Sequence, residues 1–389
     1  MKEGWEYKKL GEVCEILNGF AFKSSNYVPE GVRVIRITNV QKGYVEDNDP
    51  KYYPYETKDE LSRYLLKEGD MLLSLTGNVG RVAILGKSFL PAYLNQRVAC
   101  IRVRKGVELD LSFLFHLLYS QKFEDDCIKS SNGAAQLNMS TVWLASYLIP
   151  VPPLSEQQSI VDYLDAACAK IDAMKANAEK ALNEAKALFQ ASLKEMLEPK
   201  EGWEEKALGE VSVFSQGIQV DVNLQTEICS PGKVRFLRII DVTQGNVPPR
   251  YIDDPGERYY LKPDEIAMVR YGTVGFVCYG FEGVIANNLF KISIKDKSKL
   301  QSTYLQYFLK SDLFQSHIRK GVGGAALPAI KFGDIKHIML GVPPLSEQQR
   351  IVDYLDSLKT KVDRLQENYN KISQECDALK QAILRQVFE

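Results

Sequence analysis

The sequence has few of the residues from which metal sites are built. Its 389 residues include only three histidines, His116, His317 and His337, and none lies beside a cysteine pair at a spacing that suits a structural zinc ion. The seven cysteines are scattered and form no Cys-x-x-Cys motif. An odd number of scattered cysteines is typical of reduced, mostly buried thiols. We therefore expect no metal site.

Catalytic motifs are equally scarce. Residues 246–249, Asn-Val-Pro-Pro, lack the spacing and the aromatic residue of an amino-methyltransferase motif. Residues 321–324, Gly-Val-Gly-Gly, match a dinucleotide-binding glycine pattern poorly, and the sequence contains no Gly-Lys-Ser/Thr phosphate loop. The carboxylate pairs at 125–126 and 253–254 lack the flanking lysine of a nuclease, and surface loops explain them better. These absences argue against a self-contained methyltransferase or nuclease.

Long apolar runs are also missing. None approaches the roughly 20 residues needed to span a bilayer, and the N-terminus opens with charged and polar residues rather than a signal peptide. We expect a cytoplasmic protein without membrane contact. Because the length exceeds the size at which one hydrophobic core usually keeps growing, two or more domains are expected.

The net charge of −1 argues only weakly against nucleic-acid binding. Counted by segment, residues 1–150 carry 19 basic and 18 acidic groups (+1), and residues 202–342 carry 17 and 15 (+2). Residues 155–201 carry 6 and 9 (−3), and residues 343–389 carry 7 and 8 (−1). The two longer segments could present a phosphate-facing surface if their basic groups cluster.

What the sequence does contain is a long internal duplication. Residues 151–165 and 342–356 are identical except for Ser159 against Arg350. Gly-Trp-Glu, followed by Leu-Gly-Glu-Val, also occurs twice, beginning at Gly4 and at Gly202. A period near half of the chain is far longer than the roughly 20 to 50 residues of solenoid and propeller repeats. We therefore predict a duplicated pair, in which a globular segment is followed each time by a long helix.

Both helices have a recognisable start. Pro-Pro-Leu cannot continue a helix, and Ser155 with Gln158 three residues later fits a capping box, as does Ser346 with Gln349. We predict helices over residues 151–200 and 343–389, and globular segments over 1–150 and 201–342.

Apolar or small residues then recur in alternating steps of four and three, the spacing of a coiled-coil seam. The seams include Ile160, Leu164, Ile171, Met174 and Leu188 in the first helix, and Ile351, Leu355, Leu358, Val362, Leu365, Ile372 and Leu379 in the second. We predict that the two helices pack on each other, in a rod of about 60 Å. The alternative is that each helix packs across its own globular segment.

The globular segments are predicted to be mixed α/β, with the same order of elements in each. The first has strand patterns at residues 32–37, 70–75 and 98–103 and a short helix at 112–120, and the second has them at 235–240 and 265–269, with a helix at 302–311. Two glycine turns also correspond, residues 76–80 with 271–275 and residues 131–135 with 322–326. Glycine there permits a positive φ or a close approach of another backbone, such as a sugar-phosphate chain, although plain turns explain each one equally well.

Side chains that suit base edges or phosphates lie near these turns. We align Asn95-Gln96-Arg97 with Asn287-Asn288-Leu289. Each residue taken alone is more often a solvated polar group than a reader of DNA. The candidate DNA-binding residues are Lys23, Ser24, Arg36, Thr76, Asn78, Asn95, Gln96, Arg97, Asn132, Gln136, Gln216, Arg238, Arg270, Tyr271, Thr273, Asn287, Asn288 and Lys320.

Together, these features resemble the specificity subunit of type I restriction-modification systems. The resemblance rests on the duplicated layout, the Gly-Trp-Glu motif, the Arg-x-x-x-(Asn/Asp)-Val pattern at 36–40 and 238–242, and the doubled Pro-Pro-Leu-Ser-Glu-Gln-Gln. It covers the whole chain, and the doubled helix start is highly specific.

The resemblance implies a DNA-recognition subunit without chemistry of its own. Residues 1–150 and 201–342 would be target recognition domains, each reading one half of a split, asymmetric site in double-stranded DNA. The helices would form an antiparallel coiled-coil spacer and dock two modification subunits, which two restriction subunits can join. S-adenosylmethionine, ATP and magnesium would be bound by those partners, and no cofactor or small-molecule ligand is expected on this chain. The competing class is a coiled-coil tether that carries two domains for protein partners, which the near-zero net charge favours.

Overall fold

The computed structural model describes residues 4–58, 60–133, 137–321 and 329–389. The chain divides into two compact units. Unit 1 comprises residues 1–177 and 370–389, and unit 2 comprises residues 178–369. Each long helix therefore contributes to both units. α5 spans Leu154–Leu197 and α11 spans Leu345–Phe388.

Unit 1 is built on a four-stranded antiparallel sheet in the order β2-β8-β5-β6. A three-stranded sheet, β4-β3-β7, and the pair β1-β9 accompany it. The predicted strands at 70–75 and 98–103 and the helix at 112–120 are confirmed as β5, β8 and α2, whereas the strand predicted at 32–37 is shorter than expected, because β3 ends at Ile35 and a 3-10 turn begins at Ile37. The elements are β1 Glu6–Lys9, α1 Leu10–Val13, β2 Cys14–Asn18, β3 Val32–Ile35, β4 Tyr52–Tyr53, β5 Met71–Ser74, β6 Val82–Ile84, β7 Ala92–Leu94, β8 Val98–Val103, α2 Leu111–Leu118, α3 Gln121–Ser130, α4 Thr141–Ser146 and β9 Leu148–Val151.

Unit 2 repeats this plan, with the sheets β11-β18-β15-β16 and β13-β12-β17-β14 and the pair β10-β19. The strand predicted at 235–240 is shorter than expected, because the helix α7 begins at Ile239. The elements are β10 Glu204–Ala207, α6 Leu208–Val211, β11 Ser212–Gln216, β12 Lys233–Leu237, α7 Ile239–Thr243, β13 Arg250–Asp253, β14 Tyr260–Leu261, β15 Ile266–Val269, β16 Val277–Tyr279, β17 Gly283–Ile285, β18 Leu289–Ile294, α8 Ser302–Lys310, α9 Asp312–Gly321, α10 Phe332–Lys336 and β19 Met339–Val342.

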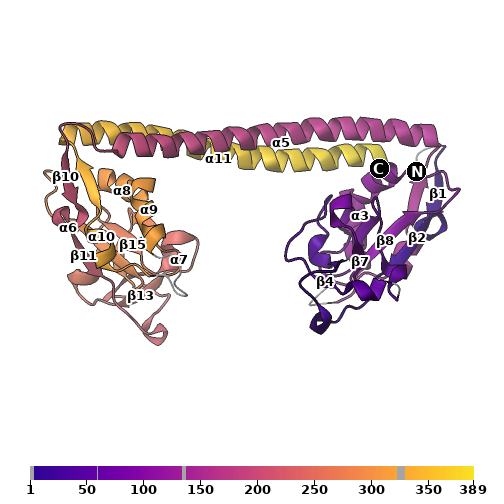
Figure 1. The fold of residues 1–389 in the computed structure, drawn as a ribbon, viewed down its shortest axis with the longest axis horizontal. Coiled ribbons are helices and arrows are strands. Elements are labelled where there is room, and N and C mark those ends of the chain that lie inside the picture. The colour runs from indigo at the N-terminus through magenta and orange to yellow at the C-terminus, as the bar shows by residue number, and fades with distance from the viewer. Residues whose placement is uncertain (1–3, 59, 134–136, 322–328) are drawn as a thin grey trace. The chain divides into compact units, whose positions relative to one another are not determined.

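Within each unit, segments of α5 and α11 run side by side (Figure 1). In unit 1, Lys380 Nζ lies 2.5 Å from Asp172 Oδ1, and Lys175 Nζ lies 3.3 Å from Asp377 Oδ1, so residue numbers fall along α11 as they rise along α5. In unit 2, Lys186 Nζ donates to Gln366 Oε1 over 2.7 Å. The predicted antiparallel pairing is confirmed.

The ends of the helices pack differently from their middles. In unit 2, Leu193 and Leu197 of α5, together with Ile351 and Leu355 of α11, belong to the core between the sheet and α8. In unit 1, the Phe388 ring meets the Phe113 ring at 5.5 Å. Packing across the globular segments, which was the alternative to pairing, therefore also occurs at the helix ends.

The predicted seam is correct at some positions and wrong at others. Met174, Leu188 and Leu379 are exposed at 58, 58 and 47%, whereas Leu182 is buried at 3%. The apolar pattern alone assigns Met174, Leu188 and Leu379 to the seam wrongly. From a correct seam residue, the next one can lie three or four residues further along the sequence, and both spacings are consistent with a heptad. Of the other predicted seam residues, Leu164, Ile171, Ile351 and Leu355 are buried, and Ile160, Leu358, Val362, Leu365 and Ile372 are half-buried.

The predicted capping boxes are not the contacts that hold the helix starts. α5 begins one residue earlier than Ser155, at Leu154, and Gln158 Nε2 donates to Asp162 Oδ1 over 2.9 Å. Gln349 likewise donates to Asp353 Oδ1 over 2.7 Å. The neighbouring glutamines, Gln157 and Gln348, are the buried ones.

Among the described residues, no helix is both long and apolar enough to cross a membrane. Five of the seven cysteines are buried, while Cys168 is half-buried and Cys229 is exposed. Burial raises the pKa of the Cys14 thiol to about 12. A thiol with so high a pKa is a weak nucleophile at neutral pH.

Candidate nucleic-acid interface

In each unit two central strands are paired, β5 with β8 in unit 1 and β15 with β18 in unit 2, and this pairing continues for one residue beyond the strands. The Leu75 amide donates to the Arg97 carbonyl over 2.9 Å in unit 1, and the Arg270 amide donates to the Asn288 carbonyl over 2.8 Å in unit 2. Directly opposed residues of an antiparallel pair present their side chains on the same face of the sheet. Leu75 and Arg97 therefore share a face in unit 1, and Arg270 and Asn288 share the matching face in unit 2.

The glycine turns that follow these pairs are structurally equivalent, as predicted. The Gly80 amide donates to the carbonyl of the last β5 residue and the Gly275 amide to that of the last β15 residue, both over 3.0 Å. Gly77 and Gly272 have φ values of 69° and 78°, a region that glycine adopts without steric cost. At Gly80 a Cβ would also lie only 3.0 Å from Cys127 Cβ of α3. The turns need glycine for their own conformation and packing.

The predicted alignment of the second strand is wrong by one residue. Leu289 is fully buried and opens β18, where it corresponds to Val98 at the start of β8. Asn288 therefore matches Arg97, whereas the sequence alignment had placed Leu289 there. The pairing of β8 with β5 and of β18 with β15 decides the register.

The structure separates buried from accessible candidates at the turns. Thr76 and Asn95 are buried at 8 and 7%, and Asn95 Oδ1 accepts from the Arg97 amide over 3.2 Å. Tyr271, in contrast, is 43% exposed. The remaining exposed candidates are Lys23, Ser24, Asn78, Gln96, Arg97, Asn132, Gln216, Thr273 and Lys320. Gln136 lies outside the described residues.

Arg238, a predicted DNA-binding residue, is tied to a buried carboxylate. Its Nε and Nη2 donate to Asp241 at 2.7 and 3.1 Å, and Arg235 Nη2 donates to the same carboxylate at 2.7 Å. Burial acts to raise the pKa of Asp241, but the hydrogen bonds from Arg238 and the charge of Arg235 outweigh it and lower that pKa. This arrangement gives Arg238 a structural role.

The equivalent Arg36 is held less firmly. Asn39 stands where unit 2 has Asp241, and it accepts from the Arg36 amide over 2.9 Å without adding a charge. The Arg36 guanidinium pairs with the exposed Asp49 at 3.4 Å, and its buried Nε has no hydrogen-bond partner in the parts of the chain that the structure describes.

Arg36 faces a polar cavity of about 530 Å³ beside the glycine turn of unit 1. Arg81, on the same cavity, donates to Gln41 Oε1 over 2.7 Å. Cationic and amide side chains are the groups that contact phosphates and base edges. The cavity is lined by Arg36, Ile37, Thr38, Gln41, Glu46, Asn48, Asp49, Thr76, Gly77, Asn78 and Arg81.

In unit 2 the accessible groups at the turn are differently arranged. The Arg270 guanidinium lies 5.1 Å from the centre of the Tyr271 ring, and its Nε donates to the Ile330 carbonyl over 3.2 Å. Asn287 Nδ2 donates to Gln219 Oε1 over 3.2 Å. Asn288 Oδ1 is buried and has no hydrogen-bond partner among the described residues.

A buried glutamine joins each globular region to the start of its long helix, and the sequence interpretation missed it. In unit 1, Gln157 Oε1 accepts from the Asp110 amide over 2.8 Å, while its Nε2 donates to the carbonyls of Glu108 at 3.0 Å and Pro152 at 2.7 Å. The doubled motif repeats both Gln157 and Gln158, so the sequence alone does not indicate which of the two is buried.

Gln348 makes the same three bonds in unit 2. Its Oε1 accepts from the Gln301 amide over 2.9 Å, and its Nε2 donates to the carbonyls of Lys299 and Pro343 at 2.7 and 2.8 Å. A repeated aspartate, eight residues or about two helical turns further on, adds a second link. His116 Nε2 lies 2.7 Å from Asp165 Oδ1, and the Tyr307 hydroxyl donates to Asp356.

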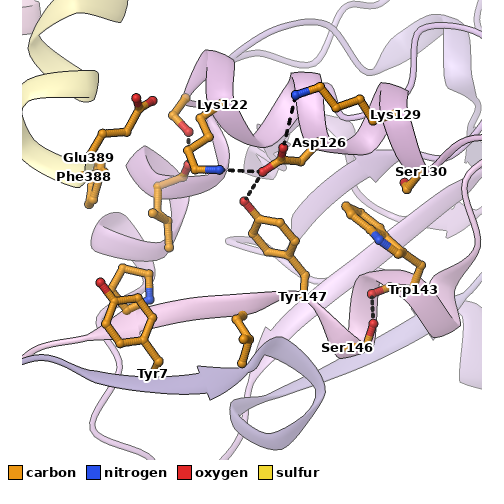
Figure 2. A pocket seen from close by; sticks show the side chains of 14 residues that line it. Tyr7, Lys122, Asp126, Lys129, Ser130, Trp143, Ser146, Tyr147, Phe388 and Glu389 are labelled. Carbon is orange, nitrogen blue, oxygen red and sulfur yellow. Dashed lines mark hydrogen bonds and ion pairs between the residues drawn. The ribbon is translucent and has the colours of Figure 1, made fainter. Parts of the chain in front are cut away.

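A larger cavity of about 800 Å³ lies in unit 1 beside α3, α4, β9 and the end of α11 (Figure 2). Asp126 lies within it and accepts from Lys122 at 2.9 Å and from the Tyr147 hydroxyl at 3.0 Å, with Lys129 3.9 Å away. Burial, followed by the charge of Asp126, raises the pKa of Tyr147. The lysines are thus already paired with a carboxylate. In the described parts of the chain, no group of three or more His, Cys, Asp and Glu side chains is placed to hold a metal ion.

Comparison with known proteins identifies the same family over both halves of the chain. Residues 2–184 and 200–374 match the type I restriction modification DNA specificity domain. The chain is 25% identical over 99% of its length to the EcoBI specificity subunit of Escherichia coli, of which it covers 86%. It is 23% identical over its full length to the StySPI specificity subunit of Salmonella potsdam, of which it covers 89%.

Solved structures share the fold. A chain from a study of complex assembly and conformational transition in the type I R-M system superposes with a TM-score of 0.76 at 21% identity, covering 100% of this chain and 98% of that one. The HsdS subunit from Thermoanaerobacter tengcongensis gives a TM-score of 0.54 at 22% identity, with coverages of 99 and 97%.

Proposed function

Because the chain belongs to the type I restriction-modification DNA specificity family, as a non-catalytic specificity subunit with two recognition domains, we propose that each unit reads one half of a bipartite DNA site. The observation that carries this proposal is the pair of equivalent sheet ends, one in each unit. Each presents a glycine turn with accessible cationic and amide groups beside it.

The two half-sites should differ in sequence, which makes the whole site asymmetric. At equivalent positions the units carry Asn78 against Thr273 and, after the corrected register, Arg97 against Asn288, while the exposed Tyr271 of unit 2 corresponds to the buried Thr76 of unit 1. Side chains of such different size and hydrogen-bonding capacity read different base edges. The accessible candidates, rather than the buried Thr76 and Asn95, are proposed to make these contacts.

The paired helices are proposed to set the spacer between the half-sites. If both units approach one face of the duplex through the major groove, the half-sites lie about one helical turn, roughly 10 bp, apart from centre to centre. This leaves a nonspecific spacer of about 5 to 8 bp once each half-site takes a few bases. The ion pairs between α5 and α11 support this role, because they hold the helices in one register.

Modification subunits are proposed to dock on the outer faces of the helices, and restriction subunits to join them. In unit 1, Tyr163, Met174 and Leu379 leave 52, 58 and 47% of their surface exposed, and in unit 2 Leu188 and Tyr354 leave 58 and 45%. Large apolar side chains that a coiled-coil seam leaves exposed are suited to a further helix. S-adenosylmethionine, ATP and magnesium are proposed to belong to those partners.

The proposal is tested by mapping methylated adenines in a cell that expresses this chain with the modification subunit of its own system. We expect one motif with two unlike half-sites separated by a fixed spacer. Duplex-binding measurements with the purified proteins provide the second readout, and salt-sensitive binding should appear or tighten when the modification subunit is added. If the chain binds no duplex DNA, with or without the modification subunit, and directs no methylation, it would instead be a tether for protein partners.

A further inference from the structure

One pair of positions at the end of the central sheet carries an arginine in both units, but on opposite strands. In unit 1 the pair is Leu75 on the β5 side and Arg97 on the β8 side. In unit 2 it is Arg270 on the β15 side and Asn288 on the β18 side. The equivalent strands are fixed by the ladder registers, so the arginine has changed strand between the two copies while the cation has been kept.

The two arginines are accessible in different ways. Arg97 is exposed, and its guanidinium has no hydrogen bond or ion pair with any part of the chain that the structure describes. Arg270 is half-buried, and it is oriented by the Tyr271 ring and by one hydrogen bond from Nε to the Ile330 carbonyl. Among the described residues, no carboxylate pairs with the terminal guanidinium nitrogens of either arginine, in contrast to Arg238.

The change of strand separates two kinds of contact. A phosphate contact carries no sequence information and can be made from the same position in both copies. A side chain that reads a base must instead lie where that base lies, so its position can differ between two units that read different half-sites. A planar guanidinium matches the O6 and N7 acceptors of guanine in the major groove with two parallel hydrogen bonds. Because the arginine lies on different strands in the two units, contact with a guanine is favoured over contact with the DNA backbone.

We propose that Arg97 and Arg270 are specificity-determining residues that each contact a guanine, one in each half-site. This inference rests on the proposed function, because it assigns a base to the site described above.

The test is methylation mapping with the full chain and its modification subunit. In R97Q we expect the preference for guanine to fall about 10- to 100-fold at one position of one half-site, with the other half-site and the spacer unchanged. R270Q should have the same effect in the opposite half-site. R63Q and R258Q are matched controls, because these arginines are exposed and lie 4.6 and 5.6 Å from a tyrosine ring in the same units.

Arg→Lys variants distinguish charge from shape. A phosphate contact tolerates lysine, whereas a two-bond contact to guanine is weakened by it. The inference would be overturned if R97K and R270K kept full discrimination for guanine. It would also be overturned if the Gln variants weakened methylation uniformly at every base position, or if R97Q and R270Q relaxed the same half-site. Thermal melting of each variant excludes misfolding. If wild-type protein directs no bipartite methylation at all, the proposed function fails rather than this assignment.

Discussion

Gln157 and Gln348 show how one side chain can fix the angle at which a domain meets a helix. Each is fully buried and makes three hydrogen bonds to main-chain groups, two of which belong to the neighbouring globular region. An amide is the side chain that can accept one bond and donate two. Leucine would fill the space but leave these groups unpaired.

We predict that Gln157→Leu lowers the free energy of unfolding of unit 1 by about 2 to 4 kcal/mol, because buried polar groups lose their partners. Gln157→Glu should be at least as harmful, since a carboxylate accepts from Asp110 but cannot donate to two carbonyls. Chemical unfolding measures the change. Gln158→Leu is the matched control, and its effect should stay below about 0.5 kcal/mol because Gln158 is exposed. Equal losses in both variants would contradict the assigned role.

Asp241 is the clearest electrostatic difference between the two copies. Since its pKa is lower in the folded state than in the unfolded state, its contribution to stability is present above the unfolded pKa, about 4, and is lost as the pH falls through the folded value. We predict that Asp241→Asn destabilises unit 2 by about 1 to 3 kcal/mol at pH 7 and that this deficit shrinks below about pH 4.

Trp203 allows this prediction to be measured in unit 2 alone. It is one of three tryptophans, and the other two, Trp5 and Trp143, lie in unit 1 and can be replaced by phenylalanine. Fluorescence-detected unfolding of the Asp241→Asn variant is then compared with Glu257→Gln, a change at an exposed carboxylate. A deficit that is constant from pH 7 to pH 3 would rule out the electrostatic explanation.

Among the elements, the long helices show which part of a coiled coil can be predicted. The heptad spacing located Leu164 and Ile171 correctly, because these positions lie on the centre of the buried face. It failed one residue away, where Met174 is exposed and Lys175 is half-buried and paired with Asp377. The partner helix decides between such neighbours, and its register depends on residues about 200 positions away.

We predict that inserting one heptad into α5 together with a matching heptad into α11 lengthens the DNA spacer by about 3 bp, since seven residues add about 10 Å and each base pair about 3.4 Å. Both half-sites should keep their sequences, as methylation mapping would show. Insertion into α5 alone is the control, because it breaks the pairing of Lys175 with Asp377 and should abolish methylation. Altered half-site bases in the double insertion would contradict the spacer role.

For the whole molecule, the duplication implies that each recognition domain acts independently on its own half-site. We predict that replacing residues 1–150 with the corresponding segment of a relative changes one half-site and keeps the other half-site and the spacer. The exchange point lies before the repeated segment at 151–165, so Gln157 stays with its helix. Methylation mapping of the hybrid gives the answer, and retention of the original site would refute the assignment of unit 1 as a reader.

The amino-acid sequence alone determined the duplicated plan, the mixed α/β segments and the two helix starts. These follow from local patterns, namely hydrophobic period, Pro-Pro breaks and glycine turns, which act over a few neighbouring residues. Only the tertiary structure decided that Gln157, rather than Gln158, fixes the helix, and that Asn288, rather than Leu289, stands opposite Arg270. Such choices depend on partners in other strands and helices, so the same residue can be a buried link or a solvated side chain according to what is packed against it.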